Sequence, residues 1–182
     1  MELDKICIDK EIRDYFTKLS GLNIPIQREM QTQNTYRLLK FIKRYPVEAG
    51  PYPDVSLFEN GNRIFSDLVI LFGVRRLLYE LHGQFPFSEY RVALGTQQGV
   101  DIAAARRGIT LAGEAFSVAR TFFPTKRRSA LKSLSKTTAN YKILMFNSDA
   151  VLNPAGYDLR TEQDVCNLVI DVEEGLKELN LL

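Results

Sequence analysis

The chain has few of the residues that most often carry catalysis or hold zinc. Its 182 residues include one histidine and two cysteines. Cys7 and Cys166 lie far apart, with no CxxC or Cys/His cluster, so their spacing argues against zinc and does not indicate a disulfide scaffold. Ser-His-Asp or Cys-His catalysis would rest on His82 alone. That residue falls at a predicted helix C-terminus, where capping is the simpler role.

Long apolar runs and familiar phosphate or hydrolase motifs are also missing. The longest apolar run, 68–74, is too short to span a bilayer, and the acidic start MELD is not followed by an apolar segment. We therefore expect a cytoplasmic protein. No Gly-rich phosphate loop, GxSxG or HExxH motif is found, which disfavours an enzyme for small molecules on another α/β scaffold. The net charge of +2 permits an anionic partner without arguing for one.

The first third of the chain is predicted to be helical, with two connecting segments. Apolar spacing predicts helices over 7–20 and 33–44, separated by a polar segment, and Gly21 suits a left-handed C-cap. The basic face of the second helix is interpreted as solvated rather than as a DNA contact. Proline and glycine make 45–62 a loop. We expect an N-terminal helical extension over 1–50 and an α/β core over 63–182.

The core is predicted to contain both helices and strands. A helix over 63–81 is apolar around most of its circumference and should be buried on more than one side. An extended segment, 88–94, precedes a hairpin within 99–119, whose turn is Arg106-Arg107-Gly108. A basic helix over 124–136, a strand over 141–147 and a helix over 162–179 follow. The order is α-β-β-β-α-β-α.

This order predicts a mixed sheet flanked by helices, an α/β sandwich. The hairpin makes its own strands antiparallel, whereas the helix between the third and fourth strands permits a right-handed crossover that makes those strands parallel. Within the hairpin, Asp101 and Glu114 fall on adjacent strands. Two carboxylates this close could share a divalent cation, which is how many nucleases hold magnesium beside a scissile phosphate.

Residues 63–149 resemble the PD-(D/E)XK, or restriction-endonuclease-like, nuclease superfamily. In that family a helix, a three-strand meander, a second helix and a fourth strand form the core. The first motif acid corresponds to Asp101 in Gly99-Val100-Asp101, and the second to Glu114 in Glu114-Ala115-Phe116.

The resemblance implies an endonuclease that hydrolyses DNA with Mg²⁺ or Mn²⁺ held by Asp101 and Glu114. Many members carry a further acid on the first core helix. Asp67 is the candidate here, with Glu59 and Glu80 less well placed. A homodimer is a further expectation, because two-fold partners suit duplex cleavage.

The chain departs from this pattern at Phe116, where the family usually has a lysine that orients water and stabilises transition-state charge. In one interpretation a basic group from elsewhere replaces it. Lys126 or Lys132 is preferred as the catalytic residue, and the other candidates are Arg120, Arg127 and Lys142.

Two further interpretations stay open. The protein could be an inactive member of the fold that binds nucleic acid or a protein partner. Alternatively, Asp101 is an ordinary acid at a strand edge and Glu114 pairs with an arginine. Gln97 and Gln98, just before Asp101, could contact a substrate, although a polar loop is the default interpretation.

Overall fold

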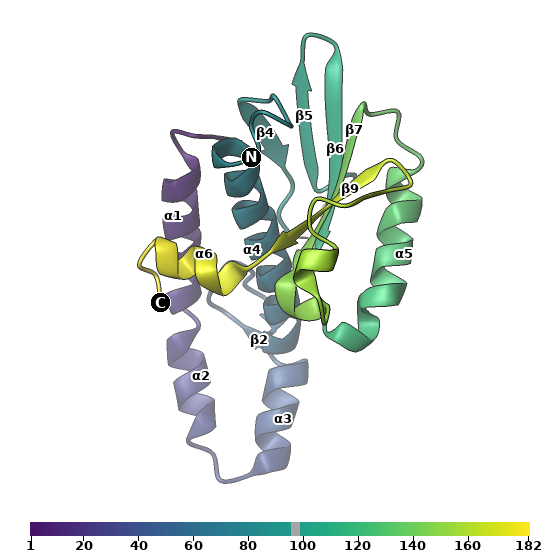
Figure 1. Ribbon diagram of the computed structural model, residues 1–182. Helices are drawn as coiled ribbons and strands as arrows, with labels where there is room; N and C mark the ends of the chain where they lie inside the picture. Colours follow the sequence, from purple (N-terminus) through teal and green to yellow (C-terminus); the bar gives the residue numbers. More distant parts are fainter. Residues whose placement is uncertain (96–98) are drawn as a thin grey trace.

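The molecule is built on one large sheet with helices on both faces (Figure 1). The computed structural model describes residues 1–95 and 99–182. In spatial order the sheet consists of β1 (Glu2–Asp4), β4 (Glu89–Val92), β5 (Ile102–Arg106), β6 (Ile109–Phe116), β7 (Tyr141–Asn147), β9 (Val165–Ile170) and β8 (Thr161–Glu162). A short ribbon pairs β2 (Pro46–Val47) with β3 (Val55–Ser56).

The predicted mixed sheet is confirmed. Strands β4, β5 and β6 are antiparallel, and β6, β7 and β9 are parallel. The hairpin turn has two successive residues with positive φ, Arg107 at 49° and Gly108 at 82°. This backbone matches the right-handed twist of the strands that it joins. The crossover from β6 to β7 runs through α5 (Phe123–Leu134), as a parallel connection requires.

Two hydrophobic cores lie on opposite faces of the sheet. The larger one packs α4 (Leu57–Tyr79) and α1 (Ile8–Ser20) against one face, and α4 approaches β7 so closely that a Cβ on Gly73 would overlap Met145. The smaller core lies under α5 and includes Phe116, Phe123 and Phe146. The predicted burial of the long helix on several sides is confirmed, because it contacts both the sheet and the N-terminal helices.

Several predictions about the N-terminal half were wrong. Residues 23–33 contain α2 (Asn23–Met30), since Pro25 sits in the first turn, where its missing N–H costs nothing. The predicted helix over 33–44 is confirmed as α3 (Thr35–Arg44). The segment 45–62 contains β2, β3 and the start of α4, which begins at Leu57 because Ser56 caps the amide of Glu59. Gly21 is right-handed, with φ of −60°.

The prediction of a helix over 162–179 was also wrong. This segment forms β9, buried on both faces, and then the short helix α6 (Val172–Glu178). Asp171 begins α6 by accepting a hydrogen bond from the amide of Glu174. Within the described residues, no helix is long and apolar enough to span a membrane.

Candidate active site

A cleft of about 940 Å³ opens where β6 ends and β5 begins, between the first half of α4 and α5. Five charged side chains predicted or considered as site residues line it. They are Glu59 and Asp67 from α4, Asp101 before β5, Glu114 from β6 and Lys126 from α5. Residues far apart in the sequence therefore meet in one concave surface.

Asp101 and Glu114 come together through the register of the hairpin. Ile102 is opposite Gly113, so the next pair along the ladder is Asp101 and Glu114, on one face of the sheet. Asp101 Oδ2 accepts the N–H of Ala115 at 2.8 Å. Glu114 Oε1 accepts the hydroxyl of Ser133 at 2.6 Å. Each carboxylate thus keeps one oxygen without a hydrogen bond to the described residues.

The electrostatics of this pair favour a bound cation. Burial, helped by the negative charges of Glu114 and Asp67, raises the pKa of Asp101 to about 6, against the opposing effects of the Ala115 amide and Lys126. No ion pair within 4 Å links Asp101 or Glu114 to a basic side chain of the described residues. A cation bound between the two carboxylates would offset the cost of burying their charge and would reduce their mutual repulsion.

Asp67 has a different environment, although it lines the same cleft. Its side chain is only 1% exposed. One carboxylate oxygen accepts the hydroxyls of Tyr15, at 2.6 Å, and Tyr52, and the other accepts the N–H of Gly95 at 2.9 Å. Burial raises the pKa of Asp67, and these hydrogen bonds oppose the rise. Asp67 therefore ties α1 and the loop before α4 to the chain segment that leads to Asp101.

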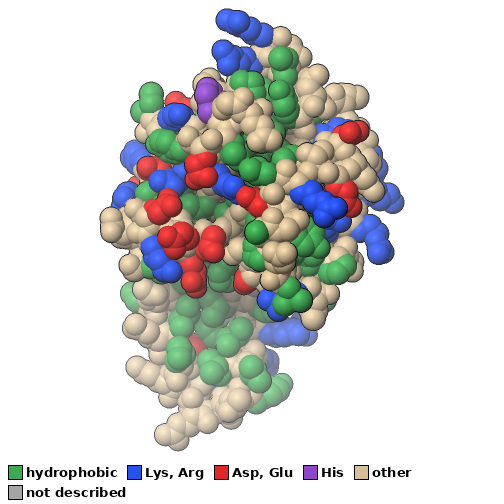
Figure 2. Space-filling view, viewed as in Figure 1, with side chains coloured by type: hydrophobic (Ala, Val, Ile, Leu, Met, Phe, Trp, Pro, Cys, Tyr) green, Lys and Arg blue, Asp and Glu red, His purple; other side chains and the backbone are tan. Residues whose placement is uncertain are grey.

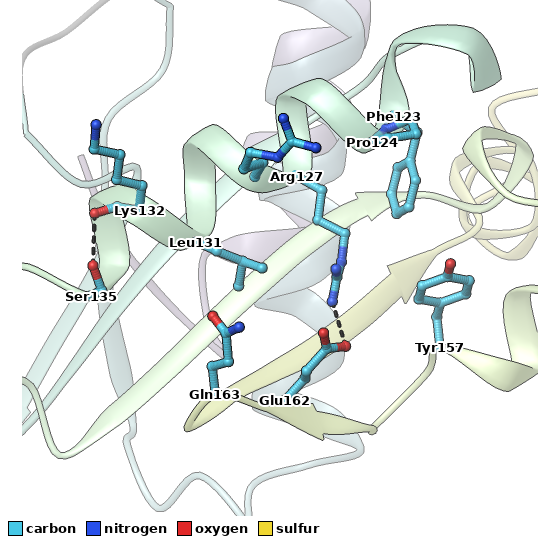
Figure 3. Close-up of a pocket in the computed structure, with 10 residues that line it drawn as sticks. Phe123, Pro124, Arg127, Leu131, Lys132, Ser135, Tyr157, Glu162 and Gln163 are labelled. Atoms are coloured by element: carbon cyan, nitrogen blue, oxygen red, sulfur yellow. Dashed lines mark hydrogen bonds and ion pairs between the residues drawn. The ribbon is translucent and has the colours of Figure 1, made fainter.

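The two preferred lysines lie on different sides of α5. Lys126 lines the cleft, and its charge lowers the pKa of Asp101. Lys132 lines a separate groove of about 560 Å³ between α5 and β8 (Figure 3). There the guanidinium of Arg127 reaches the carboxylate of Glu162 at 2.7 Å, and the amino group of Lys132 points away from this pair. Arg120 and Lys142 line neither opening.

Phe116, where the resemblance to the nuclease superfamily predicts a lysine, is a core residue. It is 2% exposed and stacks on Phe146 with a centroid separation of 6.0 Å. Phe123 from α5 lies 6.1 Å from the same ring. The side chain that would otherwise point a charge at the carboxylates thus anchors α5 to the sheet.

The remaining candidates lie outside the carboxylate pair. Glu59 pairs with Arg63 at the cleft wall, and Glu80 pairs with Arg76 at the far end of α4. The ring nitrogen Nδ1 of His82 lies 3.1 Å from the carbonyl of Phe87. Gln97 and Gln98 lie outside the described residues.

Sequence reasoning missed several residues of the cleft. Ser133 follows Lys126 by two helical turns, so the 126/129/133 spacing on one face of α5 was a usable signal. Phe58 and Phe122 also line the cleft and expose their rings. Tyr15 could not have been found, because nothing local links it to Asp67, 52 residues later.

The donor set suits a hard cation with few protein ligands. In residues 1–95 and 99–182 no group of three or more His, Cys, Asp and Glu side chains is placed to hold a metal ion. Mg²⁺ keeps several waters and is commonly held by one or two carboxylates together with a substrate phosphate. Asp101 and Glu114, each with an oxygen available, fit that pattern. Asp67 fits it less well, because both of its oxygens are engaged.

Comparisons with known proteins identify no relative. The chain matches no family model, no curated protein and no solved structure.

Proposed function

We propose that this protein is a Mg²⁺- or Mn²⁺-dependent DNA endonuclease with a restriction-endonuclease-like fold. One observation carries the proposal: Asp101 and Glu114 share a face at the end of two paired strands, and Lys126 lines the same cleft. The order β4-β5-β6-β7, with an antiparallel meander, a helix and a parallel strand, supports the fold.

The chain's own groups have distinct roles in this mechanism. Asp101 and Glu114 would hold the cation, which polarises the phosphate and lowers the pKa of a bound water. The Ala115 amide and the Ser133 hydroxyl fix the orientation of the two carboxylates. Lys126 takes the place of the missing lysine, stabilising the charge that develops on the phosphate oxygens. Asp67 positions the segment before Asp101.

A second function is favoured by Phe116. Because the Phe116 side chain is buried in the core and supplies no charge to the site, the fold could bind nucleic acid without cleaving it. Such a protein would bind DNA with an affinity that falls steeply with salt, and would release no cleavage products in Mg²⁺.

The test is a cleavage assay on supercoiled, linear and single-stranded DNA in Mg²⁺, Mn²⁺ and EDTA. We expect cleavage only with metal, and a loss of at least about a hundredfold in Asp101→Asn and Glu114→Gln. Glu162→Gln is the matched control, since this acid pairs with Arg127 outside the cleft and its loss should leave the rate unchanged.

Two outcomes separate the alternatives. Cleavage that survives both cleft substitutions would contradict the proposed site. Salt-sensitive binding without cleavage would favour the non-catalytic function. Light scattering on the same preparations tests the proposed homodimer.

A further inference from the structure

The rim of the cleft carries two exposed aromatic rings. Phe58 from the first turn of α4 is 56% exposed, and Phe122, just before α5, is 67% exposed. Both line the cleft that contains Asp101 and Glu114. Neither ring stacks on another aromatic ring of the described residues. Two apolar rings are thus open to solvent at the mouth of a polar site.

The lining of the cleft combines four acids with two basic side chains, Arg63 and Lys126, and a basic stretch of the chain borders it. From Ala115 to Ser148 the chain contains seven lysines and arginines and no acid. Of these, Lys126 lines the cleft and forms no ion pair with the described residues, whereas Arg128 lines the groove on the other side of α5. In Figure 2, acidic side chains gather where α6 lies, and lysines and arginines lie along the edge formed by α5.

From these observations we propose that the cleft takes an unpaired DNA strand, with bases stacking on Phe58 and Phe122. This inference rests on the proposed function. Base faces are available for stacking only where a strand is unpaired, and exposed aromatic rings are the usual platforms on which proteins stack the bases of single strands. In a duplex the base faces are already stacked on one another, so the two rings would gain no partner.

The size of the cleft agrees with this substrate. A volume of about 940 Å³ is that of a site for a small molecule, for which roughly 300–1,000 Å³ is typical. We expect it to take a short stretch of one strand beside the carboxylates. A whole duplex, with a major groove alone about 12 Å wide, would have to stay outside.

The chain supplies a matched control for the rings. Phe65 is on the same helix as Phe58 and is 59% exposed, but it does not line the cleft. A general effect of removing an exposed phenylalanine would appear in Phe65→Ala as well. An effect of stacking in the cleft would appear only in Phe58→Ala, Phe122→Ala and the double variant.

The experiment measures binding of the full chain to fluorescent 12-nucleotide single-stranded DNA and to a 12-base-pair duplex. It is done in Ca²⁺, which takes the same oxygen ligands, and in EDTA. We expect the single strand to bind at least about tenfold more tightly than the duplex, and the double variant to lose at least about tenfold in affinity for it. Phe65→Ala should stay within about twofold of the unmodified protein.

Each other result overturns the inference. Equal or tighter duplex binding, an unaffected double variant, or an equal loss in Phe65→Ala would do so. A dimer that becomes a monomer in the double variant, at unchanged DNA affinity, would make the rings an interface between copies. If duplex DNA is cleaved in Mg²⁺ and the double variant cleaves it equally well, the proposed function stands and this inference fails. If neither DNA binds, both fail.

Discussion

Helix α5 separates two openings that differ in how their charges are paired. In the groove toward β8, Arg127 binds Glu162 at 2.7 Å and lies over the Tyr157 ring, so its acid and base neutralise each other. In the cleft toward α4, Asp101 and Glu114 are partly buried and contact no basic side chain of the described residues within 4 Å.

Whether the charges of an opening are paired is more informative about its function than how many charges it contains. A paired acid at a half-exposed position adds little to stability and needs no function. Two neighbouring carboxylates without a cation make the folded state less stable, and such perturbed groups cluster at functional sites. The cleft is therefore the place to look for chemistry, although the groove contains more arginines.

The largest expected effect distinguishes the two lysines of α5. Lys126→Ala should lower the rate of DNA cleavage about 10²- to 10⁴-fold, because it removes the basic group beside Asp101. Lys132→Ala should lower it far less, since its amino group lies in the other opening and acts only through long-range attraction. Single-turnover rates at saturating DNA measure both. A larger loss in Lys132→Ala would reverse the roles of the cleft and the groove.

The next effect concerns two acids within the cleft. Asp67→Ala should destabilise the protein by about 2–4 kcal/mol, because two tyrosine hydroxyls and the Gly95 amide lose their acceptor in a buried site. Glu59→Ala, which breaks only a half-exposed pair with Arg63, should cost less than about 1 kcal/mol.

Urea unfolding in EDTA measures both changes, and Mg²⁺ titration of the folded variants accompanies it. An Asp67→Ala protein of normal stability that no longer binds Mg²⁺ would make Asp67 a metal ligand rather than an anchor.

Strands β4 to β7 of the sheet and the carboxylate pair were predictable because both depend on local pattern, whereas β1, β8 and β9 were not predicted. The turn at Arg107-Gly108 sets the hairpin register, and that register places Asp101 opposite Glu114. Within the strand 141–147, residues 143–146 are a continuous apolar run, as expected for a parallel strand buried on both faces.

Strand β9 was not predictable in the same way. Val165, Leu168, Val169 and Val172 have helical spacing, yet the intervening Cys166 and Asn167 are also buried. Asn167 interrupts the apolar run that would have indicated a strand. Its side-chain nitrogen instead donates to the carbonyl of Arg160, a contact that only the folded chain shows.

From the sequence alone, the identity of the site's basic group could be narrowed only to a few candidate residues. Lys126 and Lys132 are six residues apart and therefore on different faces of α5, but the face that meets Asp101 depends on how α5 packs. That packing is set by Phe116, Phe123 and Phe146 in the smaller core. The aromatic rim required the structure too, since the apolar pattern of α4 does not show which of its phenylalanines are exposed at the cleft.

The smallest expected effect is a pH dependence of protein stability that arises from the cleft and not from the groove. The pKa of Asp101 is raised to about 6 from 3.8, so the folded protein binds this proton more tightly than the unfolded chain does. The resulting stability is fully present below about pH 4 and is lost as the pH rises through 6. Because Asp101 is partly exposed, the loss should be on the order of 2 kcal/mol rather than the full value for two pKa units.

Asp101→Asn removes this titration, so its stability relative to the unmodified protein should rise by about 1 kcal/mol between pH 5 and pH 8 in EDTA, the rest of the change lying below pH 5. Glu162→Gln, which breaks the neutralised pair in the groove, should show no such gain. Urea unfolding at the two pH values measures both. Mg²⁺ at pH 8 should stabilise the unmodified protein and not Asp101→Asn, because binding to the folded state alone adds stability. If the stability of Asp101→Asn and that of Glu162→Gln depended equally on pH, the charges of Asp101 and Glu114 would be as well neutralised as those of Arg127 and Glu162. The contrast between the two openings beside α5 would then be lost.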